Sequence, residues 1–351
     1  MALDPTFWAG RRVFVTGHTG FKGSWLLMML EQLGAKVSGF ALPPPTTPAM
    51  FEMIDGTSRC DHVIGDIRDA AALASAVARA LPEIVLHLAA QPLVRASYDT
   101  PVETYATNVM GTVNLLDACR TVASVKSIVV VTTDKCYEND GRTTGYPEEA
   151  RLGGFDPYSN SKACAELVTA SYRDSFLRDA GTGVATARAG NVIGGGDYAD
   201  DRLVPDAIRA FTAGQAVAIR NPDAIRPWQH VMEPLRGYLM LAQSLSGDAT
   251  RFANGWNFGP ATSDMAPVHA VLSTLAKYWG DTAGVTAQSG QHRHEAATLM
   301  LDSSLAMREL DWVPRLSLDD ALKLTADWYR TAANGGDLVA ISKHQINQFL
   351  S

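Results

Sequence analysis

The sequence lacks the features that mark membrane, secreted and nucleic-acid-binding proteins. No uninterrupted apolar run in its 351 residues reaches the roughly 20 needed to span a bilayer, and its N-terminus has neither the basic nor the apolar region of a signal peptide. The net charge is −7 and no block of Lys or Arg stands out, which argues against a nucleic-acid surface. We therefore expect a cytoplasmic protein with neither membrane nor nucleic-acid partners.

Cysteine is also scarce. The four cysteines show neither a CxxC pair nor any other metal-ligand spacing: Cys60, Cys119, Cys136 and Cys164. This spacing argues against a zinc site and against a disulfide framework. We expect most of them to be small core residues, and we expect no metal site.

Hydrophobic residues make up 46% of the chain, which is enough for a large core. Their pattern predicts strands at 11–17, 36–41, 61–64, 83–90, 125–133 and 183–189, and helices at 21–33, 69–80, 101–121 and 157–177. Such a series predicts an α/β fold with a Rossmann-like, doubly wound parallel sheet. The alternation breaks after residue 190. We therefore expect one domain over 1–190 and a smaller mixed α/β lobe over 191–351, some of whose segments return to the first domain.

A glycine-rich turn stands between the first expected strand and its helix, with the spacing GxxGxxG. The first glycine permits a tight turn, the second lets backbone N–H groups approach a pyrophosphate, and the third lets the helix pack closely on the sheet. With the strand and helix series that follows, the turn predicts a dinucleotide site. The predicted cofactor contacts here are Gly17, Thr19, Gly20, Phe21, Lys22 and Gly23.

The choice between NAD and NADP rests on absences. The second strand ends at 39–42 without the acid that commonly holds the adenosine ribose, and the nearest following basic residue is Arg59, too far along the chain to predict a 2′-phosphate site. We therefore expect NAD. Asp66, beside Ile67, could hold the adenine amino group, although Asp66 or Asp69 could instead cap the next helix.

Two further segments extend the predicted cofactor site. Leu88, Ala89 and Ala90 end the fourth expected strand with mostly small residues, which suits close approach of a ligand to the backbone but also suits simple packing. Asn108 lies inside an expected helix, where Asn is a poor helix former, so a buried polar role is expected.

The run 129–137 begins as an apolar, β-branched strand and ends in polar residues. Ligands of an open α/β sheet lie at the carboxyl ends of its strands. We therefore expect a ligand beside Thr132, Thr133, Asp134 and Lys135.

Tyr158 and Lys162 are four residues apart and share one face of an expected helix. Tyr has an unperturbed pKa of about 10, so it can serve as a base at neutral pH only near a cation. This pattern alone is frequent on surface helices. With the nucleotide turn and Thr133, it predicts a proton-transfer site.

These motifs resemble the extended short-chain dehydrogenase/reductase family over nearly the whole chain. Within that family, Thr133 and Asp134 followed by an ionisable residue resemble the nucleotide-sugar 4,6-dehydratases, which usually carry Glu where this chain has Lys135. The stretches 17–25, 133–137 and 226–231 are similar to those of members that act on CDP-glucose. The resemblance implies CDP-glucose as substrate, NAD as cofactor and a place in deoxysugar biosynthesis.

The resemblance also implies a reaction in three steps. Tyr158, as a phenolate supported by Lys162, takes the C4 hydroxyl proton while hydride passes to NAD. A base then removes the C5 proton as Asp134 protonates the departing C6 hydroxyl, and hydride returns to C6, so the cofactor ends as it began and tight retention is expected. Thr133 hydrogen-bonds to the C4 oxygen.

The role of Lys135 stays open. As the C5 base it would have to be neutral, which burial or the nearby Lys162 would favour and a close Asp134 would oppose. It could instead stay charged and stabilise the enolate oxygen, or be a solvated lysine after a strand.

The resemblance places substrate contacts in the second half of the chain: Asn191 and Arg226 at the diphosphate, and His294 and Glu295 facing the nucleoside. Asn191 could instead be a turn residue. His230, Trp228 and Trp256 are expected in the core.

The expected helices 101–121 and 157–177 match the family's dimer-forming pair, so the resemblance implies a homodimer or a dimer of dimers. Two other functions compete. A 4-epimerase would keep Tyr158 and Lys162 but would not need Asp134 and Lys135. A non-catalytic NAD sensor would be expected to lose the Tyr or the Lys.

Overall fold

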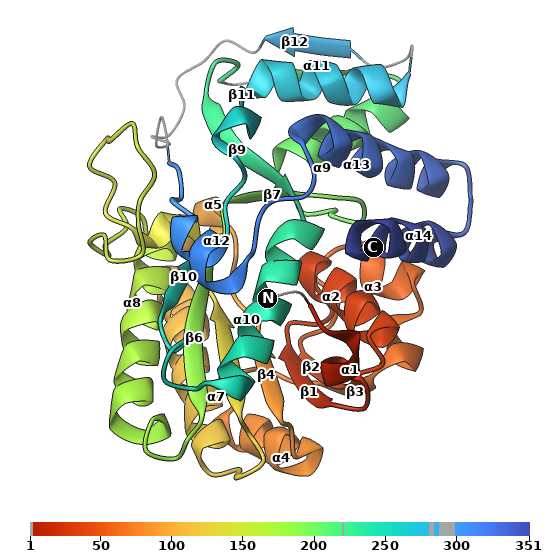
Figure 1. Ribbon diagram of the computed structural model, residues 1–351. Coiled ribbons are helices and arrows are strands. Elements are labelled where there is room, and N and C mark those ends of the chain that lie inside the picture. The colour runs from red at the N-terminus through yellow and green to blue at the C-terminus, as the bar shows by residue number, and fades with distance from the viewer. Residues whose placement is uncertain (1–2, 220, 281–283, 288–298) are drawn as a thin grey trace.

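Seven short apolar segments form the central sheet of the computed structural model, which describes residues 3–219, 221–280, 284–287 and 299–351. The strands are β1 (Arg12–Thr16), β2 (Lys36–Ala41), β3 (Asp61–Ile64), β4 (Ile84–His87), β5 (Ser127–Val131), β6 (Gly183–Arg188) and β10 (Gly255–Asn257). Their order is β10-β6-β5-β4-β1-β2-β3, and every neighbouring pair is parallel (Figure 1). The predicted Rossmann-like sheet is confirmed.

Alternate residues of each strand enter separate cores on the two faces of the sheet. In β5, Val129 and Val131 join the larger core, whereas Ile128 and Val130 join the smaller one. This period of two, with apolar residues on both faces, is what a parallel sheet buried between two helix layers requires.

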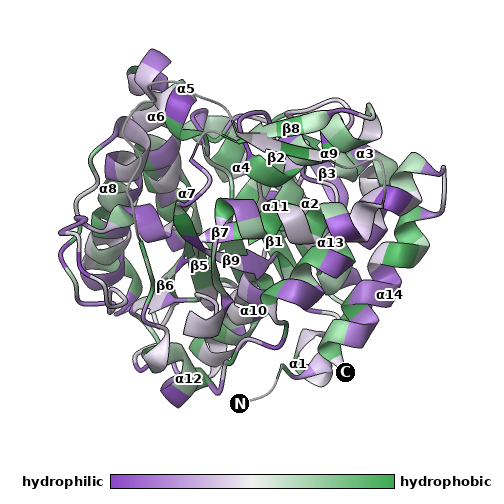
Figure 2. Cartoon of the chain, turned by 90° about the horizontal axis from the view of Figure 1, so that it is seen from above, coloured by the Kyte–Doolittle hydropathy of each residue, from purple (hydrophilic) through white to green (hydrophobic). Residues whose placement is uncertain are grey.

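Helices cover both faces. The layer over the smaller core includes α4 (Ala70–Ala80), α7 (Gly111–Arg120) and α8 (Pro157–Tyr172). The opposite layer includes α2 (Phe21–Gln32), α10 (Met232–Gly247) and α14 (Leu338–Leu350), which brings the C-terminus beside α2 (Figure 1). In Figure 2, hydrophilic and hydrophobic residues alternate along α13 (Leu318–Ala333) and α14, as expected of helices that bury one face.

Two predicted helices contain π-helical turns. The expected helix 101–121 consists of α6 (Pro101–Tyr105), a π turn η2 (Ala106–Met110) and α7, while α8 runs into a second π turn, η4 (Arg173–Leu177). Such turns often occur at functional positions, and η2 contains Asn108.

The smaller lobe lies above the upper edge of the sheet in Figure 1. It contains a three-stranded sheet in the order β11-β9-β7 and a two-stranded sheet of β12 and β8. Its elements are β7 (Asn191–Ile193), α9 (Leu203–Thr212), β8 (Ala216–Ile219), β9 (Ile225–His230), η5 (Thr262–Asp264), β11 (Met265–Pro267), α11 (Val268–Trp279), β12 (Gly284–Ala287) and α13. The remaining short helices are α1 (Pro5–Trp8), α3 (Met50–Met53), η1 (Gly56–Arg59), α5 (Val94–Asp99), η3 (Asp134–Cys136) and α12 (Ser304–Leu310).

Segments beyond residue 190 also complete the main sheet. β10 forms its outer strand beside β6, and α10 packs on β5 and β6. A boundary at residue 190 therefore does not divide the fold into two separate domains, because later segments return to the main sheet. Among the described residues, no helix has both the length and the apolar character needed to cross a membrane.

Candidate active site

The chain leaves the sheet sharply at the carboxyl end of β5. The strand ends at Val131, earlier than the predicted 125–133, and Thr133 caps the single 3₁₀ turn η3. The Thr133 hydroxyl accepts a hydrogen bond from the backbone N–H of Lys135 at 3.3 Å and donates one to Asp134 Oδ1 at 2.9 Å. The polar residues therefore sit in a turn, where they need not alternate across the sheet as strand residues do.

Asp134 and Lys135 differ in exposure. Asp134 is 2% exposed, and Gly190 leaves room for it, because a Cβ at residue 190 would lie 3.0 Å from Asp134 Oδ2. The Lys135 side chain is 36% exposed, with its Nζ 3.8 Å from Asp134 Oδ1. A buried carboxyl group and a half-buried cation thus stand side by side.

Helix α8 brings Tyr158 and Lys162 to the same place. Asp156 caps the helix by accepting hydrogen bonds from Ser159 N at 2.9 Å and Ser159 Oγ at 2.6 Å, which fixes where the helix begins. Both Tyr158 and Lys162 are buried, and α8 packs against η3. The structure therefore brings together the five predicted catalytic residues.

Burial is the main influence on the pKa of Tyr158, which it raises to about 12. The Asp134 carboxyl group also raises this pKa, whereas the Thr133 hydroxyl and the Arg202 guanidinium lower it. The Thr133 contact is thus in place, and Arg202 provides a cation that the sequence did not predict.

Lys162 is held away from solvent by the end of β5. Its Nζ donates a hydrogen bond to the carbonyl oxygen of Val131 at 3.1 Å. Burial lowers the pKa of Lys162 to about 8, although the Glu166 carboxylate opposes this shift. A buried amine of this kind is a frequent feature of catalytic sites.

A buried ion pair under the site was not predicted. Glu166 and Arg188 are paired at 2.8 Å, and both side chains are about 5% exposed or less. Glu166 also accepts hydrogen bonds at 2.5 Å from the hydroxyls of Thr132 and Thr186, and Arg188 donates one at 2.5 Å to Tyr137 Oη. Thr132, predicted as a cofactor contact, thus also links β5 to α8.

Three charged residues, at the start of α2 and in the loop before α9, lie near Asp134 and Lys162. Asp197 and Arg202 form an ion pair at 2.8 Å. Burial lowers the pKa of Lys22 to about 8, as do the nearby cations Arg202 and Lys162, while Asp134 and Asp197 oppose the change. The sequence indicated only a glycine-rich loop at 194–197, because nothing local marks Asp197 or Arg202 as neighbours of Asp134.

The glycine-rich turn has the geometry that its spacing predicts. Gly17 has φ +75°, and a Cβ there would lie 2.7 Å from Ala89 N; a Cβ at Gly23 would lie 2.2 Å from the Gly17 carbonyl oxygen. A Cβ at Gly20 would lie 3.5 Å from its nearest neighbour, the Gly17 carbonyl oxygen. The backbone at this helix start therefore remains open to a ligand. The Thr19 hydroxyl donates to the Leu42 carbonyl at 2.9 Å, and Phe21 packs against the Gly194 loop.

The segment after β4 lies against the glycine-rich turn, because a Cβ at Gly17 would lie 2.7 Å from Ala89 N. β4 ends at His87, earlier than the predicted strand 83–90, so Leu88, Ala89 and Ala90 follow the strand instead of belonging to it. Ala89 N donates to Thr16 Oγ1 at 3.2 Å, so this segment is fixed to the end of β1.

Asn108 has the buried polar role that was predicted for it. Its Oδ1 accepts from Gln91 N at 2.9 Å, and its Nδ2 donates to Gln91 O at 3.1 Å and to Ser161 Oγ at 2.9 Å. It thereby ties the segment after β4 to the catalytic helix.

Asp66 and Ile67 follow β3. The Asp66 carboxylate accepts hydrogen bonds from Arg68, which lower its pKa, and the cap of α4 is Asp69, which accepts from Ala72 N at 3.0 Å. Ile67 is 4% exposed and packs on Gly111. The contact of Asp66 with adenine stays a prediction.

The two described substrate candidates lie on neighbouring strands of the smaller lobe. Asn191 begins β7 and pairs with Trp228 of β9, two residues beyond Arg226. Both candidates are half-buried. His294 and Glu295 lie outside the described residues.

Three other residues are core residues, as predicted. Trp228 and Trp256 are buried and donate to backbone carbonyls. His230 is fully buried against Trp25, and burial lowers its pKa to about 3.

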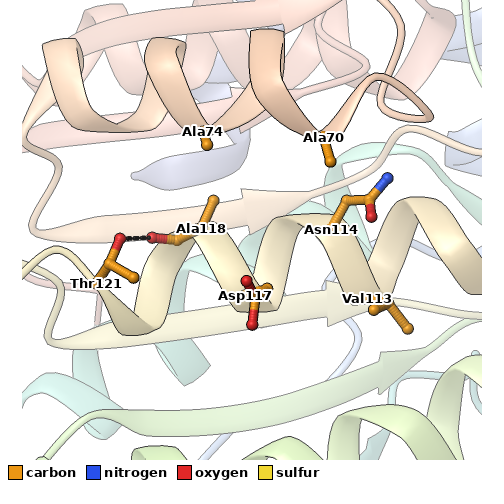
Figure 3. Close-up of a pocket in the computed structure, with 7 residues that line it drawn as sticks. All are labelled: Ala70, Ala74, Val113, Asn114, Asp117, Ala118 and Thr121. Atoms are coloured by element: carbon orange, nitrogen blue, oxygen red, sulfur yellow. Dashed lines mark hydrogen bonds between the residues drawn. The ribbon is translucent and has the colours of Figure 1, made fainter.

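A hollow of about 230 Å³ between α4 and α7 lies elsewhere on the molecule (Figure 3). It is lined by Ala70, Ala74, Val113, Asn114, Asp117, Ala118 and Thr121. Small alanines on facing helices leave this gap, and none of the catalytic candidates borders it.

Comparisons with known proteins identify the family of this chain. A family model described as GDP-mannose 4,6 dehydratase matches residues 14–325. The chain belongs to this family of nucleotide-sugar dehydratases. It is 49% identical over 354 aligned residues to a CDP-glucose 4,6-dehydratase of Salmonella typhimurium, an alignment that covers 99% of each chain. It is 30% identical to a dTDP-glucose 4,6-dehydratase of Streptomyces griseus, over 90% of this chain and 93% of that protein.

Solved structures of other nucleotide-sugar enzymes share the fold. DesIV, a dTDP-glucose 4,6-dehydratase of Streptomyces venezuelae with NAD and TYD bound, superposes with a TM-score of 0.76 at 25% identity, over 93% of this chain and 99% of that one. A UDP-glucose 4-epimerase of Thermotoga maritima superposes with a TM-score of 0.77 at 22% identity, over 91% and 99%. The family resemblance and the fold expected from the sequence are both confirmed.

Proposed function

We propose that this protein is an NAD-dependent CDP-glucose 4,6-dehydratase, a hydro-lyase that forms CDP-4-keto-6-deoxyglucose and water. The observation that carries the proposal is the 49% identity, over 99% of both chains, with the Salmonella enzyme of that name. The grouping of Thr133, Asp134, Tyr158 and Lys162 at the carboxyl edge of the sheet supports it.

NAD fits the turn after β1. Gly20 leaves the start of α2 open to a pyrophosphate, while Gly17 and Gly23 make contacts that a Cβ would prevent. Arg59, the nearest basic residue after β2, is paired with Glu31, which agrees with a cofactor lacking a 2′-phosphate. When bound, NAD accepts a hydride and returns it. We propose Thr19, Lys22, Leu88, Ala90 and Asn108 as further cofactor contacts, and the hydrogen bond from Asn108 to Ser161 links one of them to α8.

Tyr158 takes the proton of the C4 hydroxyl group. Because burial raises its pKa to about 12, its ionisation depends on nearby positive charge and hydrogen bonding. The Thr133 hydroxyl already favours the phenolate, and we propose that it also hydrogen-bonds to the C4 oxygen. Lys162 supports the Tyr158 phenolate from one turn along α8.

Asp134 gives a proton to the C6 hydroxyl group as it leaves. Its burial and its contact with Thr133 keep it beside Tyr158, so proton removal at C4 and proton delivery at C6 occur at one site. The C–O bond at C6 breaks as the C5 proton departs, and the oxygen leaves as water.

Lys135 stabilises the negative charge that develops on the C4 oxygen when the C5 proton departs. Its ammonium group lies 3.8 Å from Asp134 Oδ1, and its partial exposure keeps it in contact with solvent. This role fits a residue that replaces the Glu usual in the resembling enzymes, because a cation takes over charge stabilisation and leaves C5 deprotonation to another group or to water.

We also propose a homodimer through the helices α6, η2, α8 and η4. Large apolar side chains are exposed along them: Val102 (82%), Met110 (51%), Leu167 (60%) and Phe176 (49%). A line of such residues on neighbouring helices is typical of an interaction surface. Light scattering at micromolar concentration is expected to give twice the 37.7 kDa chain mass, and Leu167→Glu is expected to shift the mass toward one chain.

The function is tested by incubating the purified protein with CDP-glucose and following the ultraviolet absorbance that a 4-keto-6-deoxy sugar develops in alkali. UDP-, GDP- and dTDP-glucose, supplied separately, report on the nucleotide preference. A 4-epimerase would instead yield CDP-galactose, which chromatography detects, and an NAD sensor would yield neither product. Absence of keto sugar from all four substrates would overturn the proposal.

A further inference from the structure

Three side chains that commonly bind metals converge beside the cofactor turn. His18 follows Gly17 in that turn, Cys60 precedes β3, and His62 lies within β3. Their ligand atoms all lie within 4.8 Å of one another, and His18 Nε2 is 2.6 Å from His62 Nδ1. No step of the proposed reaction uses this cluster.

The register of the sheet creates the space for the cluster. His62 lies opposite Gly39 of β2, and a Cβ at Gly39 would lie 2.5 Å from His18 Cγ. The missing side chain at residue 39 therefore lets the His18 ring reach His62. The Phe51 ring closes the cluster, with its centroid 5.3 Å from that of His18 and 5.1 Å from that of His62.

The protonation of the three groups suits metal binding with one proton released. Burial, and secondarily His62, lowers the pKa of His18 to about 4, and burial also lowers the pKa of His62. Both rings are therefore neutral at neutral pH, which is the form that binds metals. Burial and the neighbouring Asp61 raise the pKa of Cys60 to about 11, so a bound metal must displace the thiol proton.

We propose that His18, Cys60 and His62 form a binding site for a borderline-soft divalent cation, with Zn²⁺ the best match, and that water fills the fourth position. Imidazole and thiolate are the ligands that Zn²⁺ prefers, and the partial exposure of Cys60 and His62 leaves room for a water ligand. The site lies outside the catalytic group and does not depend on the proposed function.

Only a small rearrangement is needed. Tetrahedral Zn²⁺, with Zn–N of about 2.0–2.1 Å and Zn–S of about 2.3 Å, places its ligand atoms about 3.3–3.6 Å apart. The two facing histidine nitrogens, 2.6 Å apart, must therefore separate by about 1 Å or less, and the thiol sulfur must approach by no more than about 1.3 Å. With Nε2 on the metal, the His18 proton resides on Nδ1, which is buried and has no hydrogen-bond partner among the described residues, while the nearby Phe40 backbone favours the protonated ring.

This proposal differs from the expectation of no metal site, and the reason is physical. The expectation rested on the spacing of the cysteines, and no other cysteine lies close to Cys60 in the sequence. His18 reaches it only because β1, β2 and β3 are adjacent in the sheet. A metal there would link the cofactor turn to β3, so binding is expected to raise the midpoint of thermal unfolding by a few degrees.

The test uses the full-length protein after treatment with a chelator. Zn²⁺ is titrated by calorimetry, and Co²⁺ by visible absorption, in which a thiolate ligand produces a charge-transfer band. We expect one equivalent per chain and the thiolate band in the wild-type protein. Cys60→Ala should remove that band, and Cys60→Ala and His62→Ala should each weaken Zn²⁺ binding by about 100-fold or more.

Cys164→Ala, at the other half-buried cysteine, and His269→Ala, at an exposed histidine, are the matched controls and should bind as the wild type does. Cys60→Ser and His62→Asn replace the alanine variants if these unfold. A Co²⁺ spectrum of the wild type without a thiolate band would overturn the proposal. So would equal Zn²⁺ affinity in the wild type and in a Cys60→Ala, His62→Ala double variant, because the cluster would then be only a hydrogen-bonded pair of histidines beside a thiol.

Discussion

The carboxyl edge of the main sheet and the smaller lobe hold their polar side chains in different ways. At the edge, Asp134, Tyr158 and Lys162 are each at most 9% exposed. In the lobe, Asn191 and Arg226 are half-buried on a three-stranded sheet. Proton transfer requires fixed distances between groups of shifted pKa, whereas holding a charged, flexible diphosphate tolerates solvent. The difference teaches that changes at the edge should affect the chemical step, and changes in the lobe should affect substrate binding.

Tyr158→Phe should have the largest effect. Removing a general base typically slows a reaction by about 10²–10⁴-fold, so we expect kcat for keto-sugar formation to fall by about 10³-fold. NAD binding, measured by calorimetry, should be retained because the ring stays in place. Tyr278→Phe, at a half-buried tyrosine that is hydrogen-bonded to Asp319, is the matched control and should be fully active. Loss through KM alone would contradict the assignment of Tyr158 to the edge chemistry.

Glu166→Ala should lower the free energy of unfolding of the protein. It leaves the buried Arg188 guanidinium without its carboxylate, and breaking a buried pair from one side typically costs about 3–5 kcal/mol of unfolding free energy. Urea denaturation measures this cost. Glu309→Ala removes a carboxylate from the more exposed pair with Arg251 and should change the midpoint little. Equal losses of unfolding free energy in the two variants would show that the buried pair stabilises the protein no more than the exposed pair does.

Arg226→Lys tests the lobe. If Arg226 binds the diphosphate as proposed, a lysine would keep the charge but lose the bidentate geometry, and hydrogen bonds to charged groups are worth about 1.5–3 kcal/mol. KM for CDP-glucose should therefore rise by about 10–100-fold while kcat changes little. Arg251→Lys, far from the site, serves as the control. A fall in kcat at unchanged KM would erase the distinction between lobe and edge.

The pH dependence should report on the edge. Because burial raises the pKa of Tyr158 to about 12, the hydroxyl is protonated at neutral pH and the phenolate fraction grows as the pH increases toward that pKa. The single-turnover rate of cofactor reduction should thus rise between pH 6 and 8, by up to about tenfold per unit. A flat profile over this range would argue against a phenolate base.

Lys135→Glu should have the smallest effect on activity. It restores the residue that the resembling dehydratases usually carry, beside an unchanged Asp134. We expect C4 oxidation, measured by the absorbance of the reduced cofactor, to continue. Keto-sugar formation should slow by about tenfold because charge stabilisation is lost. Unchanged turnover would show that Lys135, the more exposed member of the edge, takes no part in the chemistry.

Local patterns predicted much of the molecule. The strands at 36–41 and 61–64 were predicted to the residue, because two-residue periodicity and flanking turns are short-range properties. The glycine turn and the Tyr158 and Lys162 pair were likewise readable from spacing, and the structure gives them the expected geometry. Strand ends were less predictable. The segments 88–90 and 132–133 look like continuing strands but leave the sheet to form loops around the site.

Residue patterns were sufficient to predict the parallel sheet, the cofactor turn, the family and the residues at the end of β5. The distant groups that act on them emerged only from the packing of the folded chain. Arg202 reaches the surroundings of Tyr158, Arg188 supports α8 through Glu166, and His18 meets Cys60 and His62, each across long stretches of sequence. Spacing reveals contacts within one helix or turn, but contacts between elements depend on sheet order and register, which no local pattern encodes.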